Sequence, residues 1–322
     1  MCSCKLDKFE AYAPGKIMLA GEWAVLELGI PCVSVPFQKG IKVTVESSEK
    51  IFFEENKFTQ SAVDIALKYI QANGKKIAPF SISINSEISE IYDKNSEKKL
   101  KPGLGSSSAV VVAIIKGLLK FFDLRVDAKI VFKLASIAHY LAQGKIGSCY
   151  DVAVSTYNFP IIYKRFDPDW FDGELKKFLK NEICIIELID KSWPFLEIEK
   201  IDLPSEMKVY VGFSGESSST TKLIESMNKF KIENKKKYLE ICSKIGRTVE
   251  ELVFALKNSD VEKILKLFKQ NKELLNELSK SSGIILETKA LKKLCDDFEK
   301  KYGGVAKISG AGGGDCFIAV CF

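Results

Sequence analysis

The hydrophobic pattern of this chain changes its period near residue 205, and that change limits the folds open to it. Before this point, segments that alternate between apolar and polar residues, such as IKVTVES (41–47) and SISINSEI (81–88), are interleaved with segments of helical spacing. After it, four amphipathic segments of helical spacing follow one another between residues 217 and 302. The chain then ends in a short strand, a glycine-rich turn and the strand CFIAVCF. We expect an α/β (α+β) fold of two domains, 1–205 and 206–322.

Local signals predict the main elements of the first domain. Strands joined by turns are expected over 11–55, and a helix over 61–74 with Ser61 as its N-cap. The apolar run from Ser106 to about Phe122 is too long for an ordinary strand, which favours a buried helix. Asp127 is placed to cap a further helix, and the stretch 152–213 is expected to be rich in strands.

The composition indicates the cellular compartment of the protein. No apolar stretch reaches the roughly 18 residues that a membrane-spanning helix needs, and the N-terminus has no apolar run typical of a signal peptide. The nine cysteines are scattered and form no CxxC pair or zinc spacing, which indicates reduced thiols. We expect a cytoplasmic protein that binds no membrane.

The charged residues argue against two classes of protein. The net charge of +6 comes almost wholly from lysine, with only three arginines, and the basic run 229–237 has the spacing of a solvated helix face, so we expect no nucleic-acid partner. The single histidine, His139, excludes a zinc site with two histidines and leaves a Ser-His-Asp triad dependent on this one residue. In its apolar surroundings we expect His139 to be a packed structural residue.

Two glycine-rich loops suggest contact with an anion. GLGSSS (103–108) leads directly into a helix, where backbone N–H groups and the helix dipole favour negative charge, but a capped helix after a plain turn fits as well. SGAGGGDC (309–316) has more glycines than a tight turn needs, which suggests close approach to a ligand, although a flexible turn stays open. Neither GxxxxGK[ST] nor GxGxxG occurs in the chain.

Two further stretches carry chemically useful side chains. APGKIMLAGEWAVL (13–26) places Lys16 after a Pro-Gly turn, at the start of an apolar strand. KIGSCYDVAVSTY (145–157) places Asp151 among small residues. Taken singly, each is a weak signal.

Together and in this order, the four stretches resemble the motifs of the GHMP family of small-molecule kinases. The resemblance runs from about residue 11 to 322, and within the family it is closest to the phosphomevalonate kinases, on the strength of AHYLAQGKIGSCYDVAVSTY (138–157) and YKRFDPDW (163–170). It implies an N-terminal domain similar to domain 2 of ribosomal protein S5, a C-terminal ferredoxin-like domain, and an active site between them. It also implies that the first glycine-rich loop holds the phosphates of ATP.

The activity that the resemblance implies is transfer of the γ-phosphoryl group of ATP to (R)-5-phosphomevalonate, with Mg²⁺. Lys16 and Asp151 are its implied catalytic residues. The nucleotide would be held by Lys101, Gly103, Leu104, Gly105, Ser106, Ser107 and Ser108, with Ser107 as the Mg²⁺ ligand. The acceptor would be held by Lys145, Ser148, Ser218, Ser219, Thr220, Gly310, Ala311, Gly312 and Gly313. For Ser218 to Thr220, a simple helix cap fits equally well. We expect a monomer or a homodimer.

The sequence also departs from the family pattern. Cys149 stands where relatives typically have glycine, YNFP (157–160) replaces a glycine-bearing turn, and the chain ends where relatives usually continue. We therefore expect an incomplete C-terminal sheet. The nearest competing function is that of a sibling kinase that acts on an alcohol, such as mevalonate kinase. A ligand sensor without turnover, or a nucleic-acid-binding module of the S5 type, would instead make the chain a binding protein.

Overall fold

The computed structural model describes residues 8–88, 91–93, 98–100, 103–215, 220–314 and 316–322. Its larger sheet is antiparallel, with β2 at its centre, paired to β1, β3 and β6, and with β7 beyond β6. These strands span Lys8–Ala20 (β1), Cys32–Ser47 (β2), Phe80–Ser86 (β3), Ile161–Lys164 (β6) and Glu197–Lys200 (β7). The smaller sheet has the order β8-β10-β9, from Lys208–Phe213 (β8), Val305–Ile308 (β9) and Cys316–Cys321 (β10). The strands β4 (Ile91–Asp93) and β5 (Lys98–Leu100) pair antiparallel in a separate two-stranded sheet.

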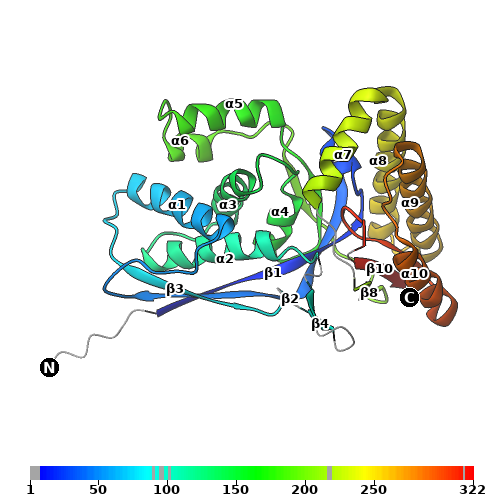
Figure 1. The fold of residues 1–322 in the computed structure, drawn as a ribbon, viewed down its shortest axis with the longest axis horizontal. Helices are drawn as coiled ribbons and strands as arrows, with labels where there is room; N and C mark the ends of the chain where they lie inside the picture. Colours follow the sequence, from blue (N-terminus) through cyan, green and yellow to red (C-terminus); the bar gives the residue numbers. More distant parts are fainter. Residues whose placement is uncertain (1–7, 89–90, 94–97, 101–102, 216–219, 315) are drawn as a thin grey trace.

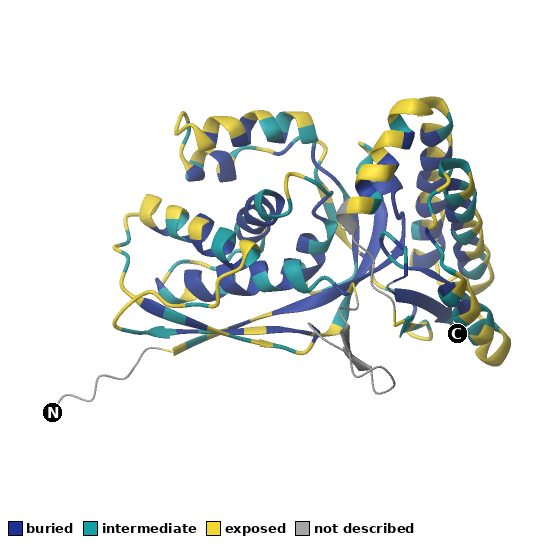
Figure 2. Cartoon of the chain, in the orientation of Figure 1, coloured by how far each residue is buried: buried dark blue, intermediate teal, exposed yellow. Residues whose placement is uncertain are grey.

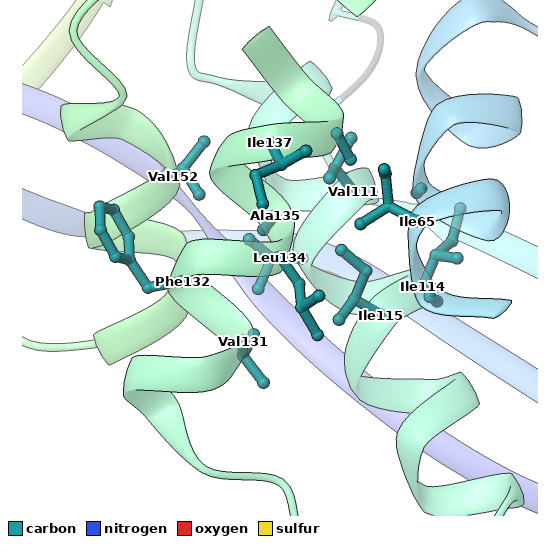
Figure 3. Close-up of a cluster of buried hydrophobic side chains, with 14 of the residues drawn as sticks. Ile65, Val111, Ile114, Ile115, Val131, Phe132, Leu134, Ala135, Ile137 and Val152 are labelled. Carbon is teal, nitrogen blue, oxygen red and sulfur yellow. The ribbon is translucent and has the colours of Figure 1, made fainter. Parts of the chain in front are cut away.

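Helices cover one face of the larger sheet. Four of them lie above it in Figure 1: α1 (Lys57–Ala72), α2 (Ser106–Phe121), α3 (Ala128–Ala142) and α4 (Tyr150–Tyr157). Two further helices, α5 (Pro168–Leu179) and α6 (Ile185–Asp190), lie beyond them. Figure 3 shows the core that the first four enclose, where Ile65 of α1, Ile114 of α2 and Leu134 of α3 meet. All three side chains are buried because each lies on the apolar face of its helix.

The second part of the chain packs its helices beside the smaller sheet. They are α7 (Thr220–Glu233), α8 (Lys235–Lys257), α9 (Val261–Ser282) and α10 (Lys289–Tyr302). The end of β1 serves both cores, because successive side chains of a strand point to opposite faces. Met18 belongs to the core under α1 to α4, whereas Ile17 and Leu19 belong to the core of the C-terminal helices. Figure 2 shows this end of the sheet as a continuous buried band.

The α/β fold with two parts is confirmed, as are the helix that begins at Ser106, the Asp127 cap and the four C-terminal helices. The division at residue 205 falls between β7 and β8, and as a domain boundary it stays a prediction. In the part of the chain that the structure describes, no helix is both long and apolar enough to cross a membrane.

Two expectations were wrong. The helix expected at 61–74 begins earlier, at Lys57, because the Asn56 side chain accepts hydrogen bonds from the backbone N–H groups of residues 58 and 59. The Ser61 hydroxyl instead donates to the carbonyl of Ala138 on α3. The stretch 152–213 contains the strands β6, β7 and β8, but it is mainly helical up to residue 190. Val152, Val154 and Thr156 lie in the buried helix α4, and Asp167 with Pro168 starts α5 rather than breaking a strand.

Candidate active site

A cavity of about 350 Å³ opens where the end of β1 meets α2, α4, α7 and the loop after β9. Both polar and apolar residues line it. The residues that line it are Lys16, Met18, Glu22, Trp23, Val25, Leu26, Gly103, Gly105, Ser106, Ser107, His139, Gln143, Ile146, Gly147, Ser148, Cys149, Tyr150, Asp151, Ile224, Ser309, Gly310 and Ala311. Both parts of the chain therefore contribute to one site.

Lys16 reaches into this cavity from β1. Strand pairing with β2 is irregular between Pro14 and Lys16, so the backbone N–H of Lys16 bonds instead to the carbonyl of Leu104, at 2.8 Å. Its ammonium donates to the carbonyl of Gly103 at 2.9 Å and lies 5.6 Å from the centre of the Tyr150 ring. Burial lowers the pKa of Lys16, but the Tyr150 hydroxyl and the Asp151 carboxylate outweigh it, so the pKa lies above its ordinary value. The cavity thus holds a fixed positive charge at neutral pH.

The first glycine-rich loop is shaped around the Lys16 side chain. Gly105 has φ +83°, a conformation that L side chains rarely adopt, and an added Cβ there would lie 2.7 Å from Cγ of Lys16. An added Cβ at Gly15 would lie 2.8 Å from the Leu104 carbonyl oxygen. Glycines at 15 and 105 therefore let the loop lie directly against the strand that carries the lysine.

The start of α2 faces the cavity without a side-chain cap. The N-cap residue is Gly105, which has no side chain to accept a hydrogen bond from the helix. The first N–H groups of α2 are therefore left for another partner. Ser106 and Ser107 line the cavity, and the Ser107 hydroxyl lies 3.2 Å from Nε2 of His139. Ser108 is fully buried and donates to the Gly105 carbonyl, so it braces the loop from within.

Asp151 and His139 lie together on the same wall. The Asp151 carboxylate accepts a hydrogen bond from the N–H of Val152 at 3.0 Å and lies 3.8 Å from Nε2 of His139. His139 is buried and stacks on Phe58, with ring centres 5.3 Å apart. Burial lowers the pKa of His139, an effect that Asp151 opposes, so the imidazole is neutral at pH 7. His139 is a packed residue, as expected, and also part of the cavity wall.

The second glycine-rich loop has two different contacts. An added Cβ at Gly310 would lie 3.6 Å from both the Lys16 ammonium and the Tyr150 hydroxyl, so this glycine faces the cavity. Gly312 instead lies against the loop after α9, where an added Cβ would come within 2.4 Å of the Leu286 carbonyl oxygen. The same carbonyl accepts a hydrogen bond from the N–H of Gly313 at 2.7 Å. The cluster of glycines therefore reflects packing within the protein as much as an approach to a ligand.

The structure places the residues expected from the sequence in three groups. Those that line the cavity are Lys16, Gly103, Gly105, Ser106, Ser107, Ser148, Asp151, Gly310 and Ala311. Those that lie outside its lining are Leu104, Ser108, Lys145, Gly312 and Gly313, and the Lys145 side chain is exposed. Lys101, Ser218 and Ser219 lie outside the described residues, and Thr220 begins α7 with its side chain outside them. The roles proposed for all of these residues stay predictions.

Sequence reasoning missed several residues of the cavity. Glu22, Trp23 and Tyr150 all line it, although each lies inside a motif that was singled out for another residue. Arg165 lies behind the wall and donates to the carbonyls of Leu26, at 2.9 Å, and Gly147, at 3.4 Å. For Glu22 the apolar residues on both sides of it were the available signal, because a charged side chain is rarely buried without a partner.

Known proteins are similar to this chain over most of its length. The family described as "GHMP kinases N terminal domain" matches residues 58–159, and that described as "GHMP kinases C terminal" matches residues 223–322. Phosphomevalonate kinase of Streptomyces sp. is 26% identical over 345 residues, which cover 96% of this chain and 88% of that protein. The structure of Streptococcus pneumoniae phosphomevalonate kinase in complex with phosphomevalonate and AMPPNP is 26% identical. It has a TM-score of 0.83 and covers 98% of this chain and 92% of that one.

A relative from a sibling branch matches as well. Mevalonate kinase of Archaeoglobus fulgidus is 28% identical over 314 residues, which cover 96% of this chain and 91% of that protein. Overall sequence identity by itself therefore does not separate the two branches.

Proposed function

Because this chain belongs to the GHMP kinase family, we propose that it transfers the γ-phosphoryl group of ATP to (R)-5-phosphomevalonate, giving 5-diphosphomevalonate and ADP. The observation that carries the proposal is the position of the Lys16 ammonium. It bonds to the first glycine-rich loop at Gly103 and faces the second at Gly310. The phosphomevalonate kinases that match nearly the whole chain support the choice of acceptor.

The reaction suits a cavity with a buried cation, and it requires no strong base. An oxygen of the acceptor phosphate attacks the γ-phosphorus, and the bond between that phosphorus and the β–γ bridging oxygen breaks, so that ADP leaves with the electron pair. A phosphate monoester has a second pKa of about 6, so its nucleophilic oxygen is already deprotonated at pH 7. What remains is the repulsion between two anions, which positioning and positive charge overcome. Lys16 supplies that charge.

Asp151 has an orienting role in this scheme. Its carboxylate contributes to the raised pKa of Lys16, which keeps the ammonium charged. Asp151→Asn is expected to lower kcat by roughly 10- to 100-fold while leaving measurable turnover, since the nucleophile needs no base. Steady-state kinetics over a range of pH measure this, and total loss of turnover in a folded variant would instead assign Asp151 as a general base.

The start of α2 is the proposed place for the nucleotide phosphates. The uncapped N–H groups and the hydroxyls of Ser106 and Ser107 are the kind of groups that bind phosphate at a helix N-terminus. Among the described residues, no group of three or more acidic, histidine or cysteine side chains could hold a metal ion. Mg²⁺ usually arrives on the phosphates and keeps most of its waters. Ser107 is the residue that would contact it, and the ion would neutralise charge on the transferred group.

A coupled assay of ADP release tests the proposal, with Mg·ATP and either phosphomevalonate or mevalonate as acceptor. Turnover with phosphomevalonate is the expected result. Turnover with mevalonate alone would move the chain to the sibling branch that the Archaeoglobus relative represents, and it would require Asp151 to assist an alcohol. Binding of ATP without turnover of either acceptor would favour a ligand sensor and overturn the proposal.

A further inference from the structure

The strand that carries Lys16 is held by partners outside its sheet just where its pairing is irregular. The ladder between β1 and β2 shifts between Pro14 and Lys16. At this point the carbonyl of Pro14 accepts a hydrogen bond at 2.9 Å from the Ser155 hydroxyl of α4. The backbone N–H of Lys16 donates to the Leu104 carbonyl instead of to β2. Irregular strand pairs re-aim a side chain, so these two bonds set the direction in which Lys16 leaves the strand.

The Ser155 side chain lies beneath the site, between β1 and the first glycine-rich loop. It is fully buried, so no water can replace its hydrogen bond to Pro14. Its oxygen lies 3.5 Å from the Ser108 hydroxyl, which donates to the Gly105 carbonyl at 2.9 Å. A change at residue 155 therefore acts on the segment that carries Lys16 and borders the loop that surrounds it.

Helix α4 presents Ser155 and Asp151 on the same face, because four residues make about one helical turn. Asp151 is one of the groups that raise the pKa of Lys16, so the carboxylate acts on the ammonium while Ser155 holds the backbone of the same strand. The far end of α4 is also fixed, since the Lys116 ammonium of α2 donates to the Thr156 carbonyl at 3.0 Å. Ser155 thus belongs to a helix that is anchored to α2.

Resting on the proposed function, we propose that Ser155 is a positioning residue for phosphoryl transfer. Its hydrogen bond to Pro14 keeps the Lys16 ammonium where it meets the first glycine-rich loop and Asp151. Ser155 does not line the cavity, so it acts through Lys16 and not on a substrate. Positioning of this kind matters because a misplacement of about 1 Å can cost up to about 100-fold in rate.

Ser155→Ala tests this proposal, because it removes the hydroxyl and little else. We expect kcat to fall about tenfold while the KM for ATP stays within about threefold. The same substitution in a Lys16→Met background should change kcat less than about twofold, since a residue that acts through Lys16 then has nothing left to position. Equal fold-losses in the two backgrounds would mean that Ser155 is merely structural and would overturn the proposal.

Thr248→Val is the matched control. Thr248 is also fully buried, and its hydroxyl donates to the Lys244 carbonyl at 2.9 Å, but it lies on α8 and does not line the cavity. Both variants should have a lower Tm than the wild type, and only Ser155→Ala should lose kcat. An equal loss of kcat in Thr248→Val would assign the effect to stability, and the proposal would be wrong. Ser155→Cys keeps a side chain there with only a weak donor, and it should show the same loss of kcat if the alanine variant does not fold.

Crystal structures of the wild type and of Ser155→Ala test the inference without an acceptor. The bond from the Lys16 ammonium to the Gly103 carbonyl should be present in the wild type and broken in the variant. A Lys16 side chain that keeps this bond in the variant would overturn the inference, whatever the acceptor is. A displaced Lys16 in a chain whose wild type turns over neither phosphomevalonate nor mevalonate would support the placement of Lys16 by Ser155 and overturn only the proposed function.

Discussion

At the scale of single residues, the site depends on where two ionisable side chains are buried. Lys16 has its ammonium between two glycine-rich loops, and His139 has its imidazole between Phe58 and Ser107. The pKa of Lys16 is raised and that of His139 is lowered, so at neutral pH the first carries charge and the second does not. Each state has a measurable consequence.

Lys16→Met removes the charge and keeps most of the apolar stem. We expect kcat to fall about 100- to 1,000-fold, the usual loss when one preorganised electrostatic group is removed, while the affinity for ATP changes little. Steady-state kinetics and calorimetric titration with ATP measure the two effects. Lys42→Met, at an exposed lysine of β2, is the control and should behave as the wild type. A kcat for Lys16→Met within a few-fold of the wild type would remove Lys16 from the mechanism.

His139 makes stability depend on pH in a window where no other side chain of the chain has its ordinary pKa. Its folded-state pKa lies below the ordinary value of 6.5, so the unfolded chain takes up a proton first as the pH falls. Stability is therefore complete above about pH 6.5 and is lost as the pH drops below it. We expect the Tm to fall from pH 7.5 to pH 5.5, and to fall less in His139→Gln. Parallel curves for the two proteins would show that His139 is not the group that titrates.

At the scale of elements, the first glycine-rich loop and β1 form one unit. The backbone of Lys16 bonds to Leu104, its side chain bonds to Gly103, and that side chain passes against Gly105. The start of α2, its loop and Lys16 are therefore positioned together, so we expect a change in the loop to affect the position of the ammonium.

Comparing Gly105→Ala with a second glycine variant should separate the effect of the contact between residue 105 and Lys16 from the effect of backbone strain. The added Cβ at residue 105 would lie 2.7 Å from Cγ of Lys16, in a loop whose φ of +83° already disfavours alanine. Gly144→Ala is matched, because Gly144 has φ +85° but nothing within 4 Å of the added Cβ. Both variants should lose about 1 kcal/mol of stability, and only Gly105→Ala should also lose ATP binding and at least tenfold in kcat. Thermal unfolding, ATP titration and kinetics on both variants measure this, and equal kinetic effects would count against the contact.

At the scale of the whole molecule, one buried ion pair links the two parts of the chain. Lys307 of β9 donates to Glu22, 285 positions away, and both side chains are almost completely buried. Burial raises the pKa of Glu22 and lowers that of Lys307, while their mutual attraction opposes both shifts. Removing only one partner therefore destabilises the fold strongly, because the other charge stays buried without compensation.

Lys307→Met is expected to lower the free energy of unfolding by about 3–5 kcal/mol, because it leaves a buried carboxylate without its partner. Adding Glu22→Gln to this variant should recover part of the loss. Urea unfolding of the two single variants and the double variant gives the coupling between the sites. Lys257→Met removes an exposed pair with Glu199 and should cost no more than about 1 kcal/mol. Additive losses in the double variant would mean that the pair does not couple the two parts.

Periodicity and local signals were enough to predict much of this protein from its sequence. Three of the signals are local: the helical spacing after residue 205, the Asp127 cap, and the length of the apolar run after Ser106. Each can be read within one segment, without knowing what that segment packs against. The ordered motifs, through their resemblance to the GHMP kinases, likewise led to Lys16, Asp151 and the two glycine-rich loops, and residues of all four motifs line the cavity.

Only the tertiary structure showed which residues far apart in the sequence contact one another. The burial of DVAVSTY (151–157) as a helix depends on the neighbours that cover it, which β-branched composition does not reveal. Glu22 and Lys307 lie 285 positions apart, and nothing in their local sequence predicts that the two charges pair. Hydrogen-bond satisfaction, burial and charge pairing belong to the folded chain, because they depend on which atoms meet across hundreds of residues.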